Sequence, residues 1–231
     1  MKRSEINRYI TTAMEFIRNQ GFALPPFAFW SPQDWEQKGE EYREIRENQL
    51  GWDLTDFGSG DFEKIGLLLF TIRNGNVSPR NGLLAALQKT YAEKVMVVNP
   101  GQVTPYHYHK SKMEDIINRG GGGFLKVQVY GSLGERVLDE KSPVSVAVDG
   151  RNYSVESGSI ISLAAGESIT LFPGVFHQFW ADGTTLLLGE VSMVNDDHRD
   201  NFFLNGQGRF PAIDEDEAPR FLLVGDYSRA S

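Results

Sequence analysis

The chain has 231 residues, of which 40% are hydrophobic and 12% aromatic, and its formal net charge at pH 7 is −8. This composition predicts a soluble globular protein, and the acidic balance argues against nucleic acid or an anionic membrane surface as a partner. The chain has no cysteine, which excludes disulfides and thiolate ligands, so a metal ion would be held by His, Asp, Glu or water. Because the first residues lack the apolar core of a signal peptide, we expect a cytoplasmic protein.

The first part of the sequence predicts mainly helices. Ser4 suits the N-cap of a helix whose apolar residues recur at every third or fourth position as far as Ile17, and Gly21 predicts its end. Ser31, followed by a proline, starts a second, charged helix that we expect to run to about Asn48.

The segments up to the middle of the chain alternate between expected loop and expected structure. Residues 51–62 are expected to form a loop, and residues 64–75 predict a strand and a turn. A second serine–proline pair at Ser78 predicts the start of another helix. Residues 1–93 are therefore expected to form a helical extension with one strand.

From Lys94 onward, short β-branched runs alternate with glycine-rich turns, as in "KVMVVNPG", "TPYHYH" and "GFLKVQVYGS". Many short strands predict a sandwich or a barrel. We expect one mainly β domain over residues 1–231, with a barrel at 94–193, helices packed on its outside and a closing segment at 194–231. A separate helical domain is the alternative.

Two of the four histidines stand two residues apart, at His107 and His109. Side chains at positions i and i+2 of a strand point to the same face, so the two imidazoles converge. Glu114 follows after a gap long enough for a turn and the start of the next strand. This arrangement predicts a metal site, and a pair of surface histidines on an edge strand is the alternative.

The spacing Gly101-x5-His107-x-His109-x4-Glu114-x6-Gly121 resembles the first motif of the cupin superfamily at every position. The resemblance implies a double-stranded β-helix, or jelly-roll, barrel. It also implies that the two histidines and the glutamate are metal ligands.

A later segment, "GESITLFPGVFHQFW", resembles the second cupin motif, which supplies a further histidine after a proline–glycine turn. Here Pro173 and Gly174 are adjacent, whereas the family usually has a residue between them, and the asparagine that often ends the motif is missing. The histidine itself is present as His177, so the resemblance implies a fourth metal ligand there.

The wider sequence resembles the D-lyxose isomerase family. The segments that carry this resemblance are "EKVMVVNPGQVTPYHYHKSKMEDIINRGGGGFLKVQVYGS", "SLAAGESITLFPGVFHQFWADG" and "RFPAIDEDEAPRFLLVGDY". It implies a single-domain cupin, often a homodimer. It further implies a manganese-assisted interconversion of D-lyxose and D-xylulose, with action on D-mannose and D-fructose.

The ligand types suit this chemistry. Three neutral imidazoles and one carboxylate fill four of about six positions around a divalent ion and leave room for water or substrate. Such an ion can polarise a sugar carbonyl and stabilise the charge that develops on a cis-enediol intermediate. Nitrogen and oxygen ligands without sulfur suit Mn, Co, Fe, Ni or Zn. Among these metals, the family resemblance implies manganese.

Two lysines and one aromatic residue are candidates for the rest of the pocket. Lys94 shares a strand face with two apolar residues and would point at the metal if that face is the interior; a surface lysine is the alternative. Lys112 lies between two predicted metal ligands and could bind a sugar hydroxyl, although a solvated turn lysine is the usual reading of such a position. Phe179 is expected to pack in the core or to line one face of the sugar.

Isomerisation needs a base that moves a proton between C1 and C2 of the sugar. The acidic run "IDEDEAP" could fold over the barrel as a lid, so Glu215 is the predicted base and Asp214 a predicted substrate contact. Glu190, in the middle of a predicted strand, would be a buried carboxylate if it points inward. An iron oxygenase or a non-enzymatic sugar-binding domain is the alternative function, because the fold alone does not choose among them.

Overall fold

The computed structural model describes residues 1–76, 88–197, 199–206, 208 and 212–229. Its helical segments are α1 (Arg3–Asn19), η1 (Pro26–Phe29), α2 (Pro32–Glu36), η2 (Glu40–Tyr42), α3 (Arg43–Glu47) and η4 (Val224–Arg229). Its strands are β1 (Gly51–Thr55), β2 (Leu67–Arg73), β3 (Tyr91–Val98), β4 (Val103–His109), β5 (Glu114–Gly120), β6 (Phe124–Gly134), β7 (Val137–Asp139), β8 (Val144–Val148), β9 (Arg151–Val155), β10 (Ile160–Leu163), β11 (Ser168–Leu171), β12 (Phe176–Asp182), β13 (Leu186–Met193) and β14 (Asn201–Phe203). Within these residues, no helix is long and apolar enough to cross a membrane.

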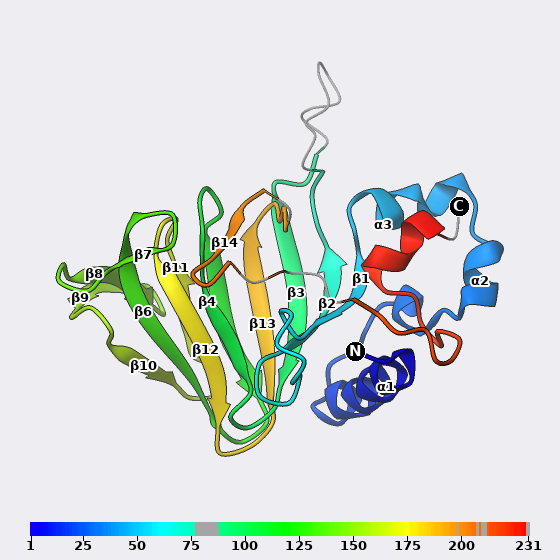
Figure 1. Cartoon of the computed structure of the whole chain (residues 1–231), viewed down its shortest axis with the longest axis horizontal. Coiled ribbons are helices and arrows are strands. Elements are labelled where there is room, and N and C mark those ends of the chain that lie inside the picture. Colours follow the sequence, from blue (N-terminus) through cyan, green and yellow to red (C-terminus); the bar gives the residue numbers. More distant parts are fainter. Residues whose placement is uncertain (77–87, 198, 207, 209–211, 230–231) are drawn as a thin grey trace.

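The strands form two antiparallel sheets that pack as a jelly roll (Figure 1). The eight-stranded sheet has the order β1-β2-β3-β13-β5-β11-β8-β9, and the six-stranded sheet has the order β10-β6-β12-β4-β14 with β7 paired to β6. The helices gather at the β1 end of the larger sheet, beside the C-terminal segment (Figure 1). The predicted mainly β, cupin-type architecture with N-terminal helices on its outside is confirmed.

The alternation of side chains along the strands creates two apolar layers. On β3, Met96 and Val98 point between the sheets into the core of the barrel, whereas Val95 and Val97 point to the outer face. The outer-face residues pack with Phe70 of β2 against α1. Lys94 has the same parity as the inward residues, so this alternation carries its ammonium group into the barrel.

Helix α1 covers the outer face of the eight-stranded sheet. Its predicted apolar stripe is buried, with exposures of at most 2%, at Ile6, Ile10, Ala13 and Ile17. The helix begins two residues earlier than the sequence predicts. Its N-cap residue is Lys2, and Ser4 instead donates its hydroxyl hydrogen bond to Asp216, at 2.7 Å.

Three local predictions differ from the structure or cannot be compared with it. The expected loop at 51–62 begins with the buried strand β1, which is held by its pairing with β2. The charged helix expected to start at Ser31 and reach Asn48 is broken at Gly39, whose backbone is extended, into α2, η2 and α3. The start of the helix predicted at Ser78 lies outside the described residues.

The two ends of the barrel differ in chemistry. At one end the hairpins close tightly, and a Cβ atom on Gly121 would lie 2.1 Å from the carbonyl oxygen of Thr185. Only glycine fits there, because Gly121 also has a φ of 114°. At the opposite end of the barrel, where β5 begins with Glu114, buried polar side chains replace the apolar side chains of the core.

Candidate metal centre and active site

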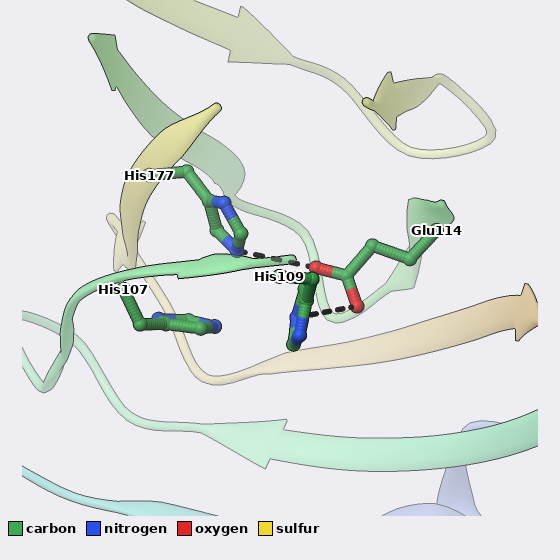
Figure 2. A group of neighbouring side chains, drawn as sticks. All are labelled: His107, His109, Glu114 and His177. Carbon is green, nitrogen blue, oxygen red and sulfur yellow. Dashed lines mark ion pairs between the residues drawn. The ribbon is translucent and has the colours of Figure 1, made fainter. Parts of the chain in front are cut away.

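Four side chains from three strands converge inside the barrel (Figure 2). His107 and His109 lie on the same face of β4, as their spacing predicts. His177 lies on β12, directly opposite His107, and Glu114 is the first residue of β5. All four are buried, and the structure therefore brings together the whole predicted ligand set.

The turn before β12 joins the second motif to the first. Gly174 has a φ of 81°, a conformation that favours glycine, and its N–H donates to the carbonyl oxygen of His109 at 2.8 Å. The pairing of β12 with β4 then shifts register between His177 and Phe179. The adjacent Pro173–Gly174 pair, although it departs from the cupin pattern, therefore still places His177 beside β4.

Backbone carbonyl groups orient two of the rings. Nδ1 of His107 lies 2.8 Å from the carbonyl oxygen of Pro105, and Nδ1 of His177 lies 3.0 Å from that of Val175. A carbonyl oxygen only accepts hydrogen bonds, so Nδ1 carries the proton in both rings. Nε2 of each ring then carries a lone pair, which is the atom that a metal ion binds.

The contacts of these lone pairs fit a bound cation. Nε2 of His177 is buried and has no hydrogen-bond partner among the described residues, although Oε1 of Glu114 lies 3.1 Å away. Two acceptors at this distance repel each other unless a cation lies between them. His109 Nε2 lies 3.3 Å from the other oxygen of Glu114. The four ligand atoms lie within 4.8 Å of one another, which suits metal–ligand bonds of about 2.0–2.2 Å.

The electrostatics of the cluster favour the metal-binding forms. Burial lowers the pKa of His107 well below its ordinary value and also lowers that of His109, so both rings are neutral at pH 7. Burial by itself raises the pKa of Glu114. The ammonium group of Lys112 and the neighbouring His109 lower this pKa by more, so the pKa of Glu114 lies well below its usual range. Glu114 is therefore an anion, as a ligand must be.

A second polar layer lies directly behind the ligands. Lys112 is 3% exposed, and its Nζ lies 2.8 Å from Glu114 Oε2 and 3.0 Å from Glu190 Oε1. Burial lowers the pKa of Lys112, but the two carboxylates raise it by more, so the net pKa is raised. Lys112 is therefore charged, which contradicts the alternative of a solvated turn lysine.

Glu190 is the centre of this polar layer. It stands directly opposite Lys94 across the β13–β3 pair, and Lys94 Nζ lies 3.1 Å from Glu190 Oε1. Burial raises the pKa of Glu190, but Lys112 and Lys94 lower it by more, so the carboxylate stays ionised. The side-chain oxygen of Asn195 accepts hydrogen bonds from both lysines, at 2.8 Å from Lys94 and 3.1 Å from Lys112.

Asp200 braces the loop between β4 and β5. Its carboxylate accepts hydrogen bonds from the backbone N–H groups of Ser111 (2.8 Å) and Lys112 (3.0 Å). The same carboxylate lies 3.7 Å from Nδ1 of His109. Asp200 thus stands behind a predicted metal ligand, where carboxylates commonly orient the imidazole.

The structure places the predicted site residues in two separate groups. Lys94, Lys112 and Phe179 line the same cavity as the histidines on β4 and Glu114. Asp214 and Glu215 are not among the residues that line this cavity. Asp214 instead pairs with Lys2 at the start of α1, and its carbonyl oxygen accepts from the N–H of Arg3 at 2.8 Å.

Glu215 forms part of an ion-pair network around the N-terminus of α1. Both of its oxygens lie 2.8 Å from the guanidinium group of Arg3, which is 1% exposed and also binds Asp226 at 3.0 Å. Glu215 lies beside Arg3, and not over the barrel, because a buried guanidinium group at the start of a helix requires carboxylates around it. The predicted lid therefore wraps α1, and this arrangement does not support Glu215 as the base.

Two polar residues of the site, Asn195 and Asp200, are not predicted from the sequence. Asn195 and Asp200 follow β13 in a segment that resembles an ordinary acidic loop, and no local pattern marks them. The signal for Glu190 was stronger, because it shares a strand face with Leu186 and Leu188, both of which lie in the core of the barrel. Strand alternation alone therefore directs Glu190 inward.

A jelly-roll barrel with a buried cluster of three histidines and one glutamate at one end of its interior defines a protein of the cupin class with a candidate metal site. The alternative of two surface histidines on an edge strand is excluded, since β4 lies between β12 and β14 and both rings are buried.

The comparisons with known sequences narrow this class. The sequence profile of the D-lyxose isomerase family matches residues 1–227. The chain is 42% identical over 230 residues to the D-lyxose/D-mannose isomerase of Escherichia coli O157:H7, with 98% of each chain covered. It is 43% identical over 232 residues to the D-lyxose/D-mannose isomerase of Serratia proteamaculans, with 99% of each chain covered. The chain belongs to the D-lyxose isomerase family.

Solved structures agree on the fold. The L-ribose isomerase of Cellulomonas parahominis, solved with L-ribose, superimposes with a TM-score of 0.59 at 18% sequence identity, covering 93% of this chain and 98% of that chain. The L-ribose isomerase of Geodermatophilus obscurus gives a TM-score of 0.58, also at 18% identity. At this identity the likeness shows a shared architecture.

Proposed function

We propose that this protein is an aldose–ketose isomerase that interconverts D-lyxose with D-xylulose and D-mannose with D-fructose. The observation that carries the proposal is the buried cluster of three histidines and Glu114, backed by two buried lysines, in a chain of the D-lyxose isomerase family. Its relatives in Escherichia coli and Serratia are named for both aldoses. Family membership favours an isomerase over the iron oxygenase or the sugar-binding domain that the sequence pattern left open.

The proposed cofactor is one Mn²⁺ ion held by the four ligands. Three neutral imidazoles and one carboxylate leave a net positive charge at a divalent ion, and their nitrogen and oxygen atoms suit manganese. When bound, the ion supplies Lewis-acid stabilisation of the negative charge that develops on the sugar oxygens. Cobalt, iron, nickel and zinc also accept these ligands and are outcomes of the metal test below.

Glu190 takes the place of Glu215 as the proposed base. It is a carboxylate that lines the ligand cavity, is ionised, and is 5% exposed, so water competes little with a bound substrate. In the cis-enediol route the base removes the proton from C2 of the aldose and returns it to C1, while the hydroxyl proton passes from O2 to O1, and together these transfers yield the ketose. Glu190 can perform both steps from one position, because the two carbons are adjacent.

The two lysines have different proposed roles. Lys112 lies next to Glu114 and Glu190, so it holds both carboxylates in place and lowers their pKa values. Lys94 lines the cavity from β3, the strand paired with that of Glu190, and can donate a hydrogen bond to a sugar oxygen. Phe179 lines the same cavity and offers an apolar surface to the carbon side of the sugar.

We also keep a homodimer and a cytoplasmic location as proposals. Four large apolar side chains remain exposed near the C-terminal end of β13, at Tyr91, Met113, Val191 and Met193. Tyr91 and Met193 are direct partners across the β3–β13 pair, and the N–H of Met193 donates to the carbonyl oxygen of Met113. Together they form a patch on one face that a second copy could cover.

The experiment that tests the function combines sugars and metals. The protein is stripped with a chelator, refilled with one metal at a time, and assayed on D-lyxose, D-mannose, D-xylose and L-ribose, with the ketose product identified by chromatography. Activity on D-lyxose and D-mannose that returns best with Mn²⁺ supports the proposal. A refilled protein that converts none of these aldoses, or that consumes oxygen instead, would overturn it.

A further inference from the structure

A chain of three buried asparagines leads from the outer loops to the two lysines of the site. Asn48 follows α3, Asn74 follows β2, and Asn195 follows β13, so the three belong to three segments that are distant in the sequence. Their exposures are 9%, 4% and 9%, respectively. Buried amides are costly unless they are hydrogen-bonded, which makes the partners of this chain informative.

Asn74 fixes the backbone of Asn195 from both sides. Its side-chain oxygen accepts from the N–H of Asn195 at 2.9 Å, and its side-chain nitrogen donates to the carbonyl oxygen of Asn195 at 3.1 Å. Asn48 in turn donates to the carbonyl oxygen of Asn74 at 2.9 Å. The main chain at Asn195 is therefore clamped, although it lies in a loop and not in a strand.

The clamped residue aims its side-chain oxygen at both ammonium groups. Asn195 Oδ1 accepts from Lys94 at 2.8 Å and from Lys112 at 3.1 Å. The two lysines and the two carboxylates beside them, Glu114 and Glu190, balance in charge. Asn195 adds an acceptor without adding a third negative charge, which an aspartate at the same position would bring.

The two lysines differ in how fully they are bound. Lys112 Nζ has three oxygens within 3.1 Å, one each from Glu114, Glu190 and Asn195, so its three N–H groups are matched by three acceptors. Among the described residues, Lys94 Nζ is bound by two side chains: it lies 3.1 and 3.2 Å from the two oxygens of the Glu190 carboxylate and 2.8 Å from Asn195 Oδ1. One N–H directed between the two oxygens of Glu190 and a second donated to Asn195 leave the third N–H for a sugar oxygen.

From these contacts we infer that Asn195 is a positioning residue. It holds the Lys94 ammonium group so that its third N–H faces the cavity, and the Asn74 clamp fixes the direction in which Asn195 Oδ1 points. The inference rests on the proposed isomerase function, because Lys94 is taken to contact the sugar. It assigns a role in the reaction to a residue outside both histidine motifs.

The test is a double-mutant cycle with Asn195→Ala and Lys94→Met, measured on D-lyxose with Mn²⁺-loaded protein. Asn195→Ala should lower kcat roughly 10–100-fold, because a displacement of about 1 Å at a reacting group can cost that much. The KM should change less than kcat, and metal content should stay at one ion per chain. In the Lys94→Met background the same substitution should have a clearly smaller effect, because only the hydrogen bond from Lys112 is then lost.

A matched control separates positioning from stability. Asn118 is also a buried asparagine, and it binds the carbonyl oxygens of Gly123 and Leu163 towards the closed end of β5, away from Glu114. Asn118→Ala should lower the melting temperature while leaving kcat near that of the wild type. If Asn195→Ala fails to fold, Asn195→Asp, which keeps an oxygen at the same place, should retain more activity than Lys94→Met.

The outcomes distinguish this inference from the proposed function. If the losses of kcat caused by Asn195→Ala and Lys94→Met multiply in the double variant, the inference is overturned while the proposed function stands. The same holds if the Lys94→Met variant is as active as the wild type. It also holds if the Asn195→Asp variant is as inactive as Lys94→Met. A wild-type protein that turns over no sugar would overturn the proposed function, and the inference with it.

Discussion

His107 and His177 lie directly opposite each other across the β4–β12 pair, and the centroids of their rings are 4.2 Å apart. Each ring is held at Nδ1 by the carbonyl group of the residue two positions earlier in the chain. Two sequence motifs that are far apart along the chain therefore supply equivalent ligands from neighbouring strands. The proposed metal site therefore depends on the register of this one strand pair.

Replacing either histidine should therefore remove the ion together with the activity. His177→Ala leaves two imidazoles and one carboxylate, and we expect the purified variant to contain much less than one metal ion per chain by elemental analysis. Gln178→Ala is the matched control, because Gln178 points to the other face of β12 and donates to Gln128 at 3.0 Å. A His177→Ala protein with full metal occupancy would contradict this ligand set.

Asp200 should affect metal affinity without being a ligand. Its carboxylate braces the loop before Glu114 and lies behind His109, so Asp200→Ala should weaken metal binding about 10–100-fold, as is typical for such supporting groups. The measurement is a competition titration with a chelating dye. Asp139→Ala provides the control, since Asp139 accepts two backbone N–H groups in an unrelated turn. Equal metal affinities of the Asp200→Ala variant and the wild type would refute a supporting role.

The network around Arg3 should contribute to stability and not to chemistry. Arg3→Met leaves the buried carboxylate of Asp226 without its partner, and we expect a loss of about 3–5 kcal/mol in the free energy of unfolding. Glu215→Gln should cost only about 1 kcal/mol, because the side chain of Glu215 is 42% exposed. Urea unfolding measures both. An Arg3→Met protein with an unchanged midpoint, or a large loss of kcat in folded Glu215→Gln, would contradict this assignment.

The parts of the site that the sequence predicts are those set by short-range geometry. The spacing of His107 and His109 places both rings on one strand face without any knowledge of the rest of the fold. The same alternation directs Lys94 and Glu190 into the barrel, because both share a face with core residues. Such positions follow from the period of a strand, so one sequence is enough to find them.

The parts that the sequence does not predict depend on partners far along the chain. Glu215 lies in an acidic run that suits a lid equally well, and only its contact with Arg3, at the other end of the chain, decides where it goes. Strand β1 lacks a clear strand pattern and is fixed by its pairing with β2. Asn195 acquires its role only when the segments that contain Asn74 and Asn48 meet it.

Glu190→Gln should separate catalysis from metal binding. The amide keeps nearly the same shape but cannot take up a proton, so kcat should fall about 10²–10⁴-fold, while the metal content stays at one ion per chain. Steady-state kinetics with D-lyxose, combined with elemental analysis, measures both quantities. Because Glu190 also pairs with Lys94 and Lys112, the melting temperature of the variant should be recorded beside its kinetics. Retention of most of the wild-type kcat would mean that another group moves the proton.

The route of the hydrogen between C1 and C2 gives the last prediction. A proton carried by Glu190 can exchange with solvent before it returns to the sugar, whereas a hydride that moves directly between the carbons does not exchange. We expect isomerisation in D₂O to place deuterium at C1 of the ketose, or at C2 of the aldose in the reverse direction, as seen by NMR of the product. The described residues offer one cluster of metal-ligating side chains and a neighbouring carboxylate, which favours the enediol route. A buried base can return the same proton, so partial incorporation still agrees with this route. Full retention of hydrogen, together with a Glu190→Gln variant as active as the wild type, would show that the proton route is wrong.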